Sequence, residues 1–224
     1  SGVSTNGVKL FERNPGGAVA NVLAAATRLG DATAFIGKVG NDMHGQFLIE
    51  TLSAAGIDVE GLVQTNETFT TLAFVALSEN GERTFSFAGN PGADTQLQIK
   101  DIHESILSSC CVFHFGSLSL TDEPARSATR HAVSRAKLAG ATISYDPNYR
   151  ASLWKNQKTA MQRMRELLPY VDIMKISDEE TFLLTDWKDP AAAAAFLNDR
   201  GIPCVVVTLG KQGALVSVRG QSSV

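Results

Sequence analysis

Apolar residues recur at helical spacing directly after a pair of glycines, Gly16-Gly17, near the start of the chain. The small or apolar positions are 18, 19, 22, 23, 25, 26 and 29. This period predicts an amphipathic helix that begins at Gly17 and ends at Gly30, a residue type that commonly terminates helices. Glycines at a helix start let backbone N–H groups approach a ligand, and Asn21, one turn on, could point at the same ligand. A tight turn with close packing is the alternative interpretation.

Short apolar runs alternate with helical patterns along most of the chain. We expect strands at 8–12, 33–37, 111–115, 142–145, 173–176 and 204–209. We expect helices from the glycine-rich turn 40–45 to Gly56, from Thr121 to before Gly140, over about 157–168, from about Asp178 and from Pro190. Near-continuous apolar strands that alternate with helices are typical of a parallel sheet covered on both faces. The sequence therefore predicts an α/β fold.

One segment has a different period. Residues 71–77 form a strand-like run, and Glu79-Asn80-Gly81-Glu82 is typical of a hairpin turn. The alternation over 83–87 places Phe85 and Phe87 on one side of the second strand. We interpret the segment as a small β-sheet flap, and the alternative is that both phenylalanines cover the main core.

Composition and charge narrow the class of protein. The 224 residues are 44% hydrophobic and carry a net charge of −3, without a basic cluster, which argues against a nucleic-acid partner. Cys110, Cys111 and Cys204 lie in apolar runs and predict buried thiols in a reducing compartment. The sequence shows no membrane-spanning run and no secretory signal, so we expect a cytoplasmic protein.

Polar and glycine residues follow the predicted strands, where ligands bind in open α/β sheets. Arg150 could hold a phosphate or several hydroxyls, or only pair with a carboxylate. Glu180 could act on a metal through water, or lie on a solvated helix face. Gly210 and Gly213 could offer N–H groups to phosphate, or form a plain turn. The usual phosphate-loop and dinucleotide motifs are absent from the sequence.

Four motifs together resemble the phosphofructokinase-B family of carbohydrate kinases, and bacterial fructokinases most of all. They are 16–22 with Arg28-Leu29-Gly30, 35–42 with Gly45, 146–150 with Leu153-Trp154, and 207–210 with Gly213. The resemblance implies a ribokinase-like fold with a parallel-rich sheet flanked by helices. It implies a core domain of 13–70 and 88–224 and a β-lid of 1–12 and 71–87, and the lid also makes a dimer contact in some relatives.

The resemblance also implies roles for single residues and the cofactors ATP and Mg²⁺. The sugar-binding positions are Gly16, Gly17, Asn21, Phe87 and Arg150. The nucleotide-binding positions are Asp146, Lys175, Ser177, Glu180, Thr208, Gly210 and Gly213, with Glu180 reaching Mg²⁺ through water. Ser177 departs from the family pattern, since many relatives carry Asn there.

The implied activity is transfer of the γ-phosphoryl group of ATP to a sugar hydroxyl, with fructose as the first substrate. Residues 91–95, 120–122 and 124–126 also resemble aminoimidazole riboside kinase, and a non-catalytic sugar-binding homologue is a further alternative. The family's catalytic aspartate lies in a G-A-G-D motif that does not occur in the sequence, so no catalytic base is named. Because right-handed β-α-β winding needs a strand before the helix at Gly17, we expect the chain to be part of a longer polypeptide.

Overall fold

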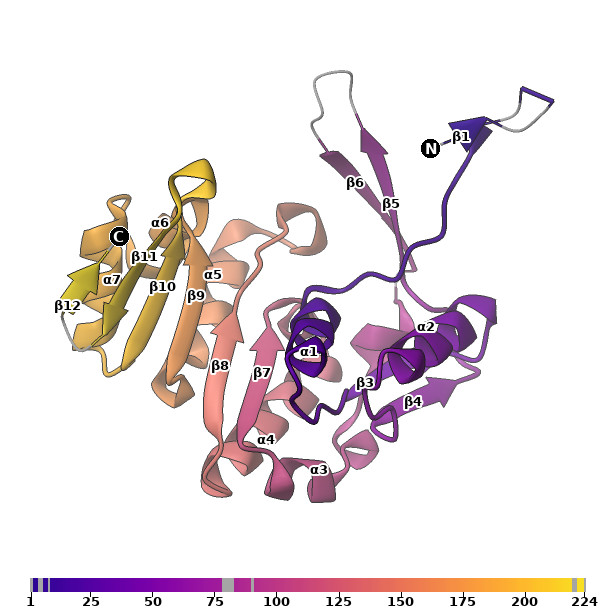
Figure 1. Cartoon of the computed structure of the whole chain (residues 1–224), viewed down its shortest axis with the longest axis horizontal. Coiled ribbons are helices and arrows are strands. Elements are labelled where there is room, and N and C mark those ends of the chain that lie inside the picture. The colour runs from indigo at the N-terminus through magenta and orange to yellow at the C-terminus, as the bar shows by residue number, and fades with distance from the viewer. Residues whose placement is uncertain are drawn as a thin grey trace. The chain divides into compact units, whose positions relative to one another are not determined.

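The computed structural model describes residues 2–3, 6–7, 9–77, 83–89, 91–218 and 221–223. The chain divides into two compact units, Ser1–Gln96 and Leu97–Val224, whose elements are labelled in Figure 1. The predicted turn at 79–82 lies outside the described residues. The predicted grouping of 13–70 with 88–224, apart from a lid, stays a prediction.

Two helices and a pair of parallel strands form the first unit around a small core. They are α1 (Ala18–Arg28), β3 (Gly37–Gly40), α2 (Met43–Ala54) and β4 (Leu62–Thr65). The buried side chains of this core are Val39, Leu52, Ile57 and Leu62. Helix α1 confirms the predicted helix. Gly17 at its start and Gly30 after its end have φ values of +117° and +102°. Both values lie where residues with a Cβ are strained.

The strand predicted at 33–37 is wrong in its position. Strand β3 begins only at Gly37, where β4 supplies partners, and ahead of it Ala34 forms a single bridge with Asp58. Within the strand predicted at 8–12, residues 9–10 form β2 (Lys9–Leu10), which pairs antiparallel with β1 (Gly2–Val3).

The glycine-rich turn before α2 is held by one carboxylate. Asp42 caps the helix: its Oδ1 accepts hydrogen bonds of 2.9 Å from the amides of His44 and Gly45, and its Oδ2 accepts one of 2.8 Å from the Thr70 amide. Burial alone raises the pKa of Asp42, but these hydrogen bonds outweigh burial and hold the pKa below its ordinary value. A Cβ on Gly45 would lie 2.0 Å from the Gly40 carbonyl oxygen. The glycines therefore serve close packing of the turn.

The predicted hairpin is confirmed as β5 (Leu72–Leu77) paired antiparallel with β6 (Arg83–Ala88). The rings of Phe85 and Phe87 stack on one face with centroids 6.3 Å apart. At the base of the hairpin, the Thr71 hydroxyl donates to the Asp94 carboxylate. The Asp94 residue belongs to the short 3-10 helix η1 (Ala93–Gln96). The first strand is thereby fixed to the segment that follows the second.

A six-stranded sheet organises the second unit, with the strand order β12-β11-β10-β9-β8-β7 (Figure 1). Strands β7 to β10 are parallel, and β11 and β12 continue the sheet antiparallel. Their bounds are β7 (Val112–Gly116), β8 (Thr142–Asp146), β9 (Ile173–Ser177), β10 (Cys204–Thr208), β11 (Ala214–Val218) and β12 (Gln221–Ser223). The four predicted strands of this region are confirmed, each to within one residue at either end.

Helices connect these strands. They are α3 (Glu104–Ser109), α4 (Ala125–Leu138), α5 (Gln157–Glu166), α6 (Thr181–Thr185) and α7 (Pro190–Asp199). Short 3-10 turns accompany them: η2 (Ile99–Asp101), η3 (Leu118–Leu120), η4 (Ala151–Leu153), η5 (Leu168–Tyr170), η6 (Asp178–Glu180) and η7 (Gly210–Gln212). The helix predicted from Thr121 begins only at Ala125, and the Thr121 hydroxyl donates to the Leu118 carbonyl at 2.9 Å at the end of η3.

The two faces of this sheet differ in exposure. Tyr145, Met174 and Val205 pair in register on neighbouring strands and therefore share one face, and all three are fully buried. Helices α4 to α7 lie along one side of the sheet (Figure 1). The alternate residues, among them Asp146 and Lys175, are only partly buried. Among residues 97–224 as far as the structure describes them, the helices lie along one face, and the expectation of helices on both faces stays a prediction. The alternation of polar with apolar residues along β8 matches the difference in exposure.

The three cysteines are free thiols. Cys110 and Cys204 are half-buried, whereas Cys111 is exposed ahead of β7, so the prediction of buried thiols is wrong for Cys111. None of the helices in the described ranges combines the length and apolar character that a membrane crossing requires.

Candidate functional site at the carboxyl edge of the sheet

Three predicted nucleotide-binding residues end neighbouring parallel strands. Asp146, Ser177 and Thr208 are the last residues of β8, β9 and β10. Ser177 pairs in register with Thr208, and Asp146 pairs with Gly116 at the end of β7. The fold therefore brings these residues to one edge of the sheet, where α/β proteins bind ligands.

The loop after β8 is shaped by its own side chains. Asp146 Oδ1 accepts a hydrogen bond of 3.1 Å from the Asn148 amide. Asn148 adopts a φ of +46°, a left-handed conformation that asparagine tolerates better than most residues with a Cβ. Arg150 Nη1 donates to the Tyr149 carbonyl at 2.9 Å. This local geometry explains why an Asp-Pro-Asn sequence precedes the predicted arginine.

Glu180 lies under this loop. Glu180 is 7% exposed. Its carboxylate accepts hydrogen bonds from the Tyr149 amide at 2.6 Å and from the Ser177 amide at 2.9 Å. The Ser177 hydroxyl adds a third contact of 3.1 Å. Ser177 and Glu180 form a capping box around η6, which their spacing of three residues allows. The alternative of a solvated helix face for Glu180 is therefore wrong.

A pocket of about 310 Å³ opens beside the loop. Its lining includes three predicted residues, Arg150, Ser177 and Glu180. The other lining residues are Tyr149, Gln157, Glu179, Phe182 and Leu183. The lining combines charged and hydroxyl groups with apolar side chains, a combination typical of small-molecule sites.

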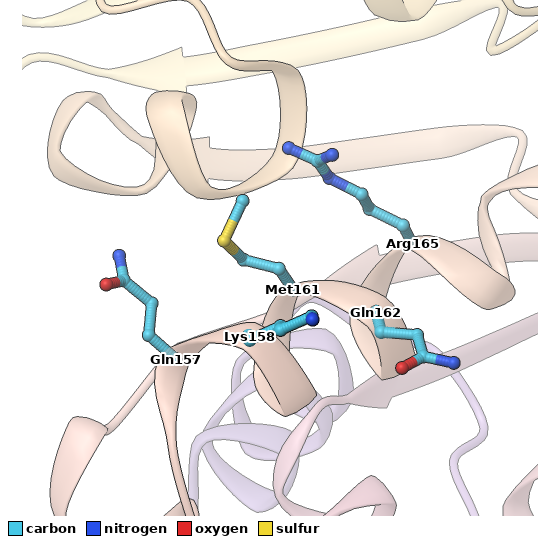
Figure 2. A pocket seen from close by; sticks show the side chains of 5 residues that line it. All are labelled: Gln157, Lys158, Met161, Gln162 and Arg165. Carbon is cyan, nitrogen blue, oxygen red and sulfur yellow. The ribbon is translucent and has the colours of Figure 1, made fainter.

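A second hollow, of about 370 Å³, lies along helix α5 and contains none of the predicted residues. Figure 2 shows Gln157, Met161 and Arg165 pointing to the same side of the helix, as their spacing of four residues requires. Lys158 and Gln162 complete its lining. Arg165 Nη2 donates to Asp186 Oδ1 at 2.9 Å, so its guanidinium serves the packing of α5 against α6.

The partly exposed face of the sheet carries a row of polar side chains. The sequence predicted Asp146 and Lys175 as site residues, but not His114 and Ser144. Lys175 Nζ lies 3.1 Å from Asp146 Oδ2, and His114 Nδ1 lies 2.9 Å from Ser144 Oγ on the two strands alongside. Burial lowers the pKa of His114; the negative charge of Asp146 acts in the opposite direction, and Lys175 adds to the lowering. Polar residues at every second position of the predicted strands were the pattern that could have indicated this row.

The turn after β10 is compact and open on its outer side. Leu209 donates its amide to the Gly213 carbonyl at 2.8 Å, and Gly210 and Gly213 adopt φ values of +57° and +99°. A Cβ on either glycine would meet nothing within 4 Å. The backbone conformation, rather than crowding, favours glycine here. Thr208 Oγ1 donates to the Ile176 carbonyl at 3.4 Å.

The remaining predicted residues belong to the first unit. Gly16 and Gly17 precede α1, and Asn21 is exposed on its first turn, with its backbone amide donating to the Gly17 carbonyl at 3.0 Å. Among the described residues, none makes a hydrogen bond to the Asn21 side chain. Phe87 is half-buried on the hairpin face that it shares with Phe85. The roles of all these residues stay predictions.

The family model for pfkB family carbohydrate kinases matches residues 2–224. The chain belongs to this family. It is 39% identical over 215 residues to probable fructokinase-5 of Arabidopsis thaliana, covering 95% of this chain and 66% of that protein. It is 41% identical over 214 residues to fructokinase-2 of Solanum lycopersicum, covering 95% and 65%. The chain thus spans just under two thirds of the length of these relatives.

Solved structures agree with this assignment. The apo fructokinase of Vibrio cholerae O395 superposes with a TM-score of 0.85 at 36% identity, over 94% of this chain and 72% of that one. The same enzyme with fructose, ADP and calcium gives a TM-score of 0.85 at 36% identity, over 93% and 67%. The Xylella fastidiosa fructokinase with ATP gives 0.84 at 35% identity, over 93% and 66%. The predicted family and ribokinase-like α/β fold are confirmed.

Proposed function

We propose that the protein is an ATP-dependent sugar kinase whose substrate is fructose. One observation carries the proposal: curated fructokinases are about 40% identical over 95% of the chain. The structure of a relative with fructose and ADP supports the same substrate pair. The reaction transfers the γ-phosphoryl group of ATP to a sugar hydroxyl, which requires positioning of both substrates and stabilisation of developing negative charge.

In this proposal the carboxyl edge of the second unit binds the nucleotide. Asp146, Ser177 and Thr208 end the strands there, with Lys175 and Glu180 beside them, and the amides of the turn at 210–213 offer donors to phosphate oxygens. Arg150 supplies a planar guanidinium that can hold a phosphate or a sugar hydroxyl at the pocket beside it. Support for these roles comes from the shared edge of the sheet.

Gly16, Gly17, Asn21 and Phe87 of the first unit bind the sugar in this proposal. The positive φ of Gly17 and the absence of a side chain at Gly16 open the start of α1 to a hydroxylated ligand. The exposed amide of Asn21 offers both a donor and an acceptor for sugar hydroxyls. Phe87 presents an aromatic face on the hairpin.

The described residues fit poorly as a magnesium site of their own. Among them, no three His, Cys, Asp or Glu side chains gather closely enough to hold a metal ion. The ammonium of Lys175 lies against Asp146, and three protein donors already occupy the Glu180 carboxylate. We therefore assign Mg²⁺ to the nucleotide phosphates, where this ion usually binds in kinases, and not to a cage of protein ligands.

We further propose that the protein acts in the cytoplasm as a dimer through its hairpin. Val75 and Phe85 pair in register on one face of the hairpin and are 43% and 37% exposed, an apolar pair that a second copy would cover. Sedimentation of wild type and of Val75→Lys tests the dimer, which the lysine is expected to dissociate. Fractionation of cells tests the location.

The activity is tested with the purified full-length protein, ATP and a panel of sugars. We expect ADP and a phosphorylated sugar with fructose, at a higher kcat/KM than with aminoimidazole riboside, ribose or glucose. A higher kcat/KM with aminoimidazole riboside would show that the riboside is the substrate, and the proposed kinase activity would stand. Sugar binding in calorimetry without phosphorylation would identify a non-catalytic homologue and overturn the proposal.

A further inference from the structure

The Glu180 carboxylate joins the loops that follow two neighbouring strands. One oxygen accepts a hydrogen bond of 2.6 Å from the Tyr149 amide, in the loop after β8. The other accepts from the amide and hydroxyl of Ser177, where β9 ends. A buried carboxylate is costly unless protein donors replace its water, and here three donors do so. The Glu180 carboxylate therefore has a structural role at the site, because it links the loop after β8 to the end of β9.

Tyr149 connects this carboxylate to Arg150. The Tyr149 amide donates to Glu180, while its carbonyl accepts from Arg150 Nη1 at 2.9 Å. Asp146 holds the other end of the same loop through the Asn148 amide. The backbone from which the Arg150 side chain extends is therefore fixed on both sides, by Asp146 before it and by Glu180 beneath it.

We propose that Glu180 is a positioning residue: it holds the Tyr149–Arg150 backbone and thereby aims the guanidinium of Arg150. This role replaces the contact with magnesium that the family resemblance implies, because protein donors fill three of the roughly four acceptor sites of the carboxylate. The inference rests on the proposed function only because that function gives Arg150 a substrate to bind. The effect of Glu180 on the Tyr149–Arg150 backbone is measured without substrate.

The first test measures hydrogen exchange of the Tyr149 amide by NMR in the full-length protein. In Glu180→Gln the new amide group opposes a backbone donor, so we expect Tyr149 to exchange about ten to a hundred times faster, the loss of one charge-assisted bond. Asp178→Asn is the matched control, because it neutralises an exposed carboxylate of the same turn, η6. Exchange at Tyr149 that is unchanged in Glu180→Gln overturns the proposal.

The second test separates positioning from metal binding. Calorimetry with MgCl₂ alone is run on wild type and Glu180→Gln, and we expect the same result for both. Weaker binding of Mg²⁺ to the variant, by about tenfold or more, overturns the proposal whatever the exchange shows. Neither test needs catalytic turnover. A protein that phosphorylates no sugar would overturn the proposed function, whereas the exchange and calorimetry results would still decide the role of Glu180.

In an active enzyme, kinetics supply a third test. If Glu180 acts through Arg150, then Glu180→Gln in an Arg150→Ala background costs little further kcat/KM, whereas independent roles give additive losses. Additive losses overturn the proposal. If Glu180→Gln does not fold, Ser177→Ala removes only the hydroxyl contact, and a smaller acceleration of Tyr149 exchange is expected. Unchanged exchange in Ser177→Ala then counts against the proposal.

Discussion

Lys175 Nζ lies 3.1 Å from Asp146 Oδ2, across two adjacent parallel strands. The Lys175 side chain is 40% exposed and that of Asp146 is 17% exposed, so the pair contributes at most about 1 kcal/mol to stability. We expect Lys175→Gln to leave the melting temperature nearly unchanged and to raise the KM for ATP several-fold. Lys158→Gln on α5 is the control. An unaltered KM for ATP would remove Lys175 from the nucleotide site.

Arg150→Ala should lower catalytic efficiency far more than stability. Loss of a charge-assisted hydrogen bond to the sugar or the transferred phosphate costs about 1.5–3 kcal/mol, or roughly a ten- to hundredfold decrease in kcat/KM. Steady-state kinetics and thermal unfolding measure the two effects. Arg200→Ala, which removes an exposed guanidinium stacked on Phe196, is the matched control. Equal kinetics for both variants would contradict the role of Arg150.

Asn21→Ala should raise the KM for the sugar more than the KM for ATP, because we propose that its exposed amide serves the sugar alone. The substitution removes no hydrogen bond that the described residues make to this side chain, so the melting temperature should hold. Arg28→Ala, in the last turn of α1, controls for changes in the helix. A parallel rise of both KM values would argue for a structural effect.

Gly45→Ala should destabilise the first unit. The new Cβ would lie 2.0 Å from the Gly40 carbonyl oxygen, so α2 must shift away from the turn. Overpacking of this kind costs about 1–3 kcal/mol, which chemical denaturation measures. Gln46→Ala changes an exposed neighbour on the same helix and should cost far less. Equal stabilities of the two variants would contradict the close packing described here.

The lowered pKa of His114 predicts that acid weakens the fold. Because burial holds this pKa below that of the unfolded chain, the unfolded state binds more protons once the pH falls below about 6.5. The free energy of unfolding should therefore be complete above that pH and decline below it, toward the folded pKa. Urea midpoints at several pH values, compared with those of His114→Gln, measure the contribution. A variant with the same pH dependence as wild type would exclude His114 as its source.

The sequence predicted the elements that depend on local patterns. The four parallel strands, the hairpin and α1 follow from alternation, helical period and glycine positions, and all were confirmed. The strand at 33–37 failed because pairing begins where β4 offers partners, a fact that neighbouring residues do not encode. The helix predicted from Thr121 begins only at Ala125 for a similar reason, since the Thr121 hydroxyl donates to a carbonyl of the preceding turn.

The long-range contacts within the site could not be predicted from the sequence. The carboxylate of Glu180 accepts from the amide of Tyr149, which lies 31 residues earlier, and no local pattern predicts this contact. Likewise, His114 meets Ser144 only because β7 and β8 pair in one particular register. Spacing along the chain carries no information about such pairings, whereas the identities of the strand ends could be read from it.

Side chains along β8 alternate between the two faces of the sheet, so the number of residues in this strand is constrained. Deleting one residue between 142 and 145 would turn Tyr145 away from the helices and Asp146 toward them. Such a deletion would exchange a ring for a charge in the core and withdraw the carboxylate from Lys175 in a single step. We expect related sequences to tolerate many substitutions here, and to accept insertions and deletions only in the connections between strands.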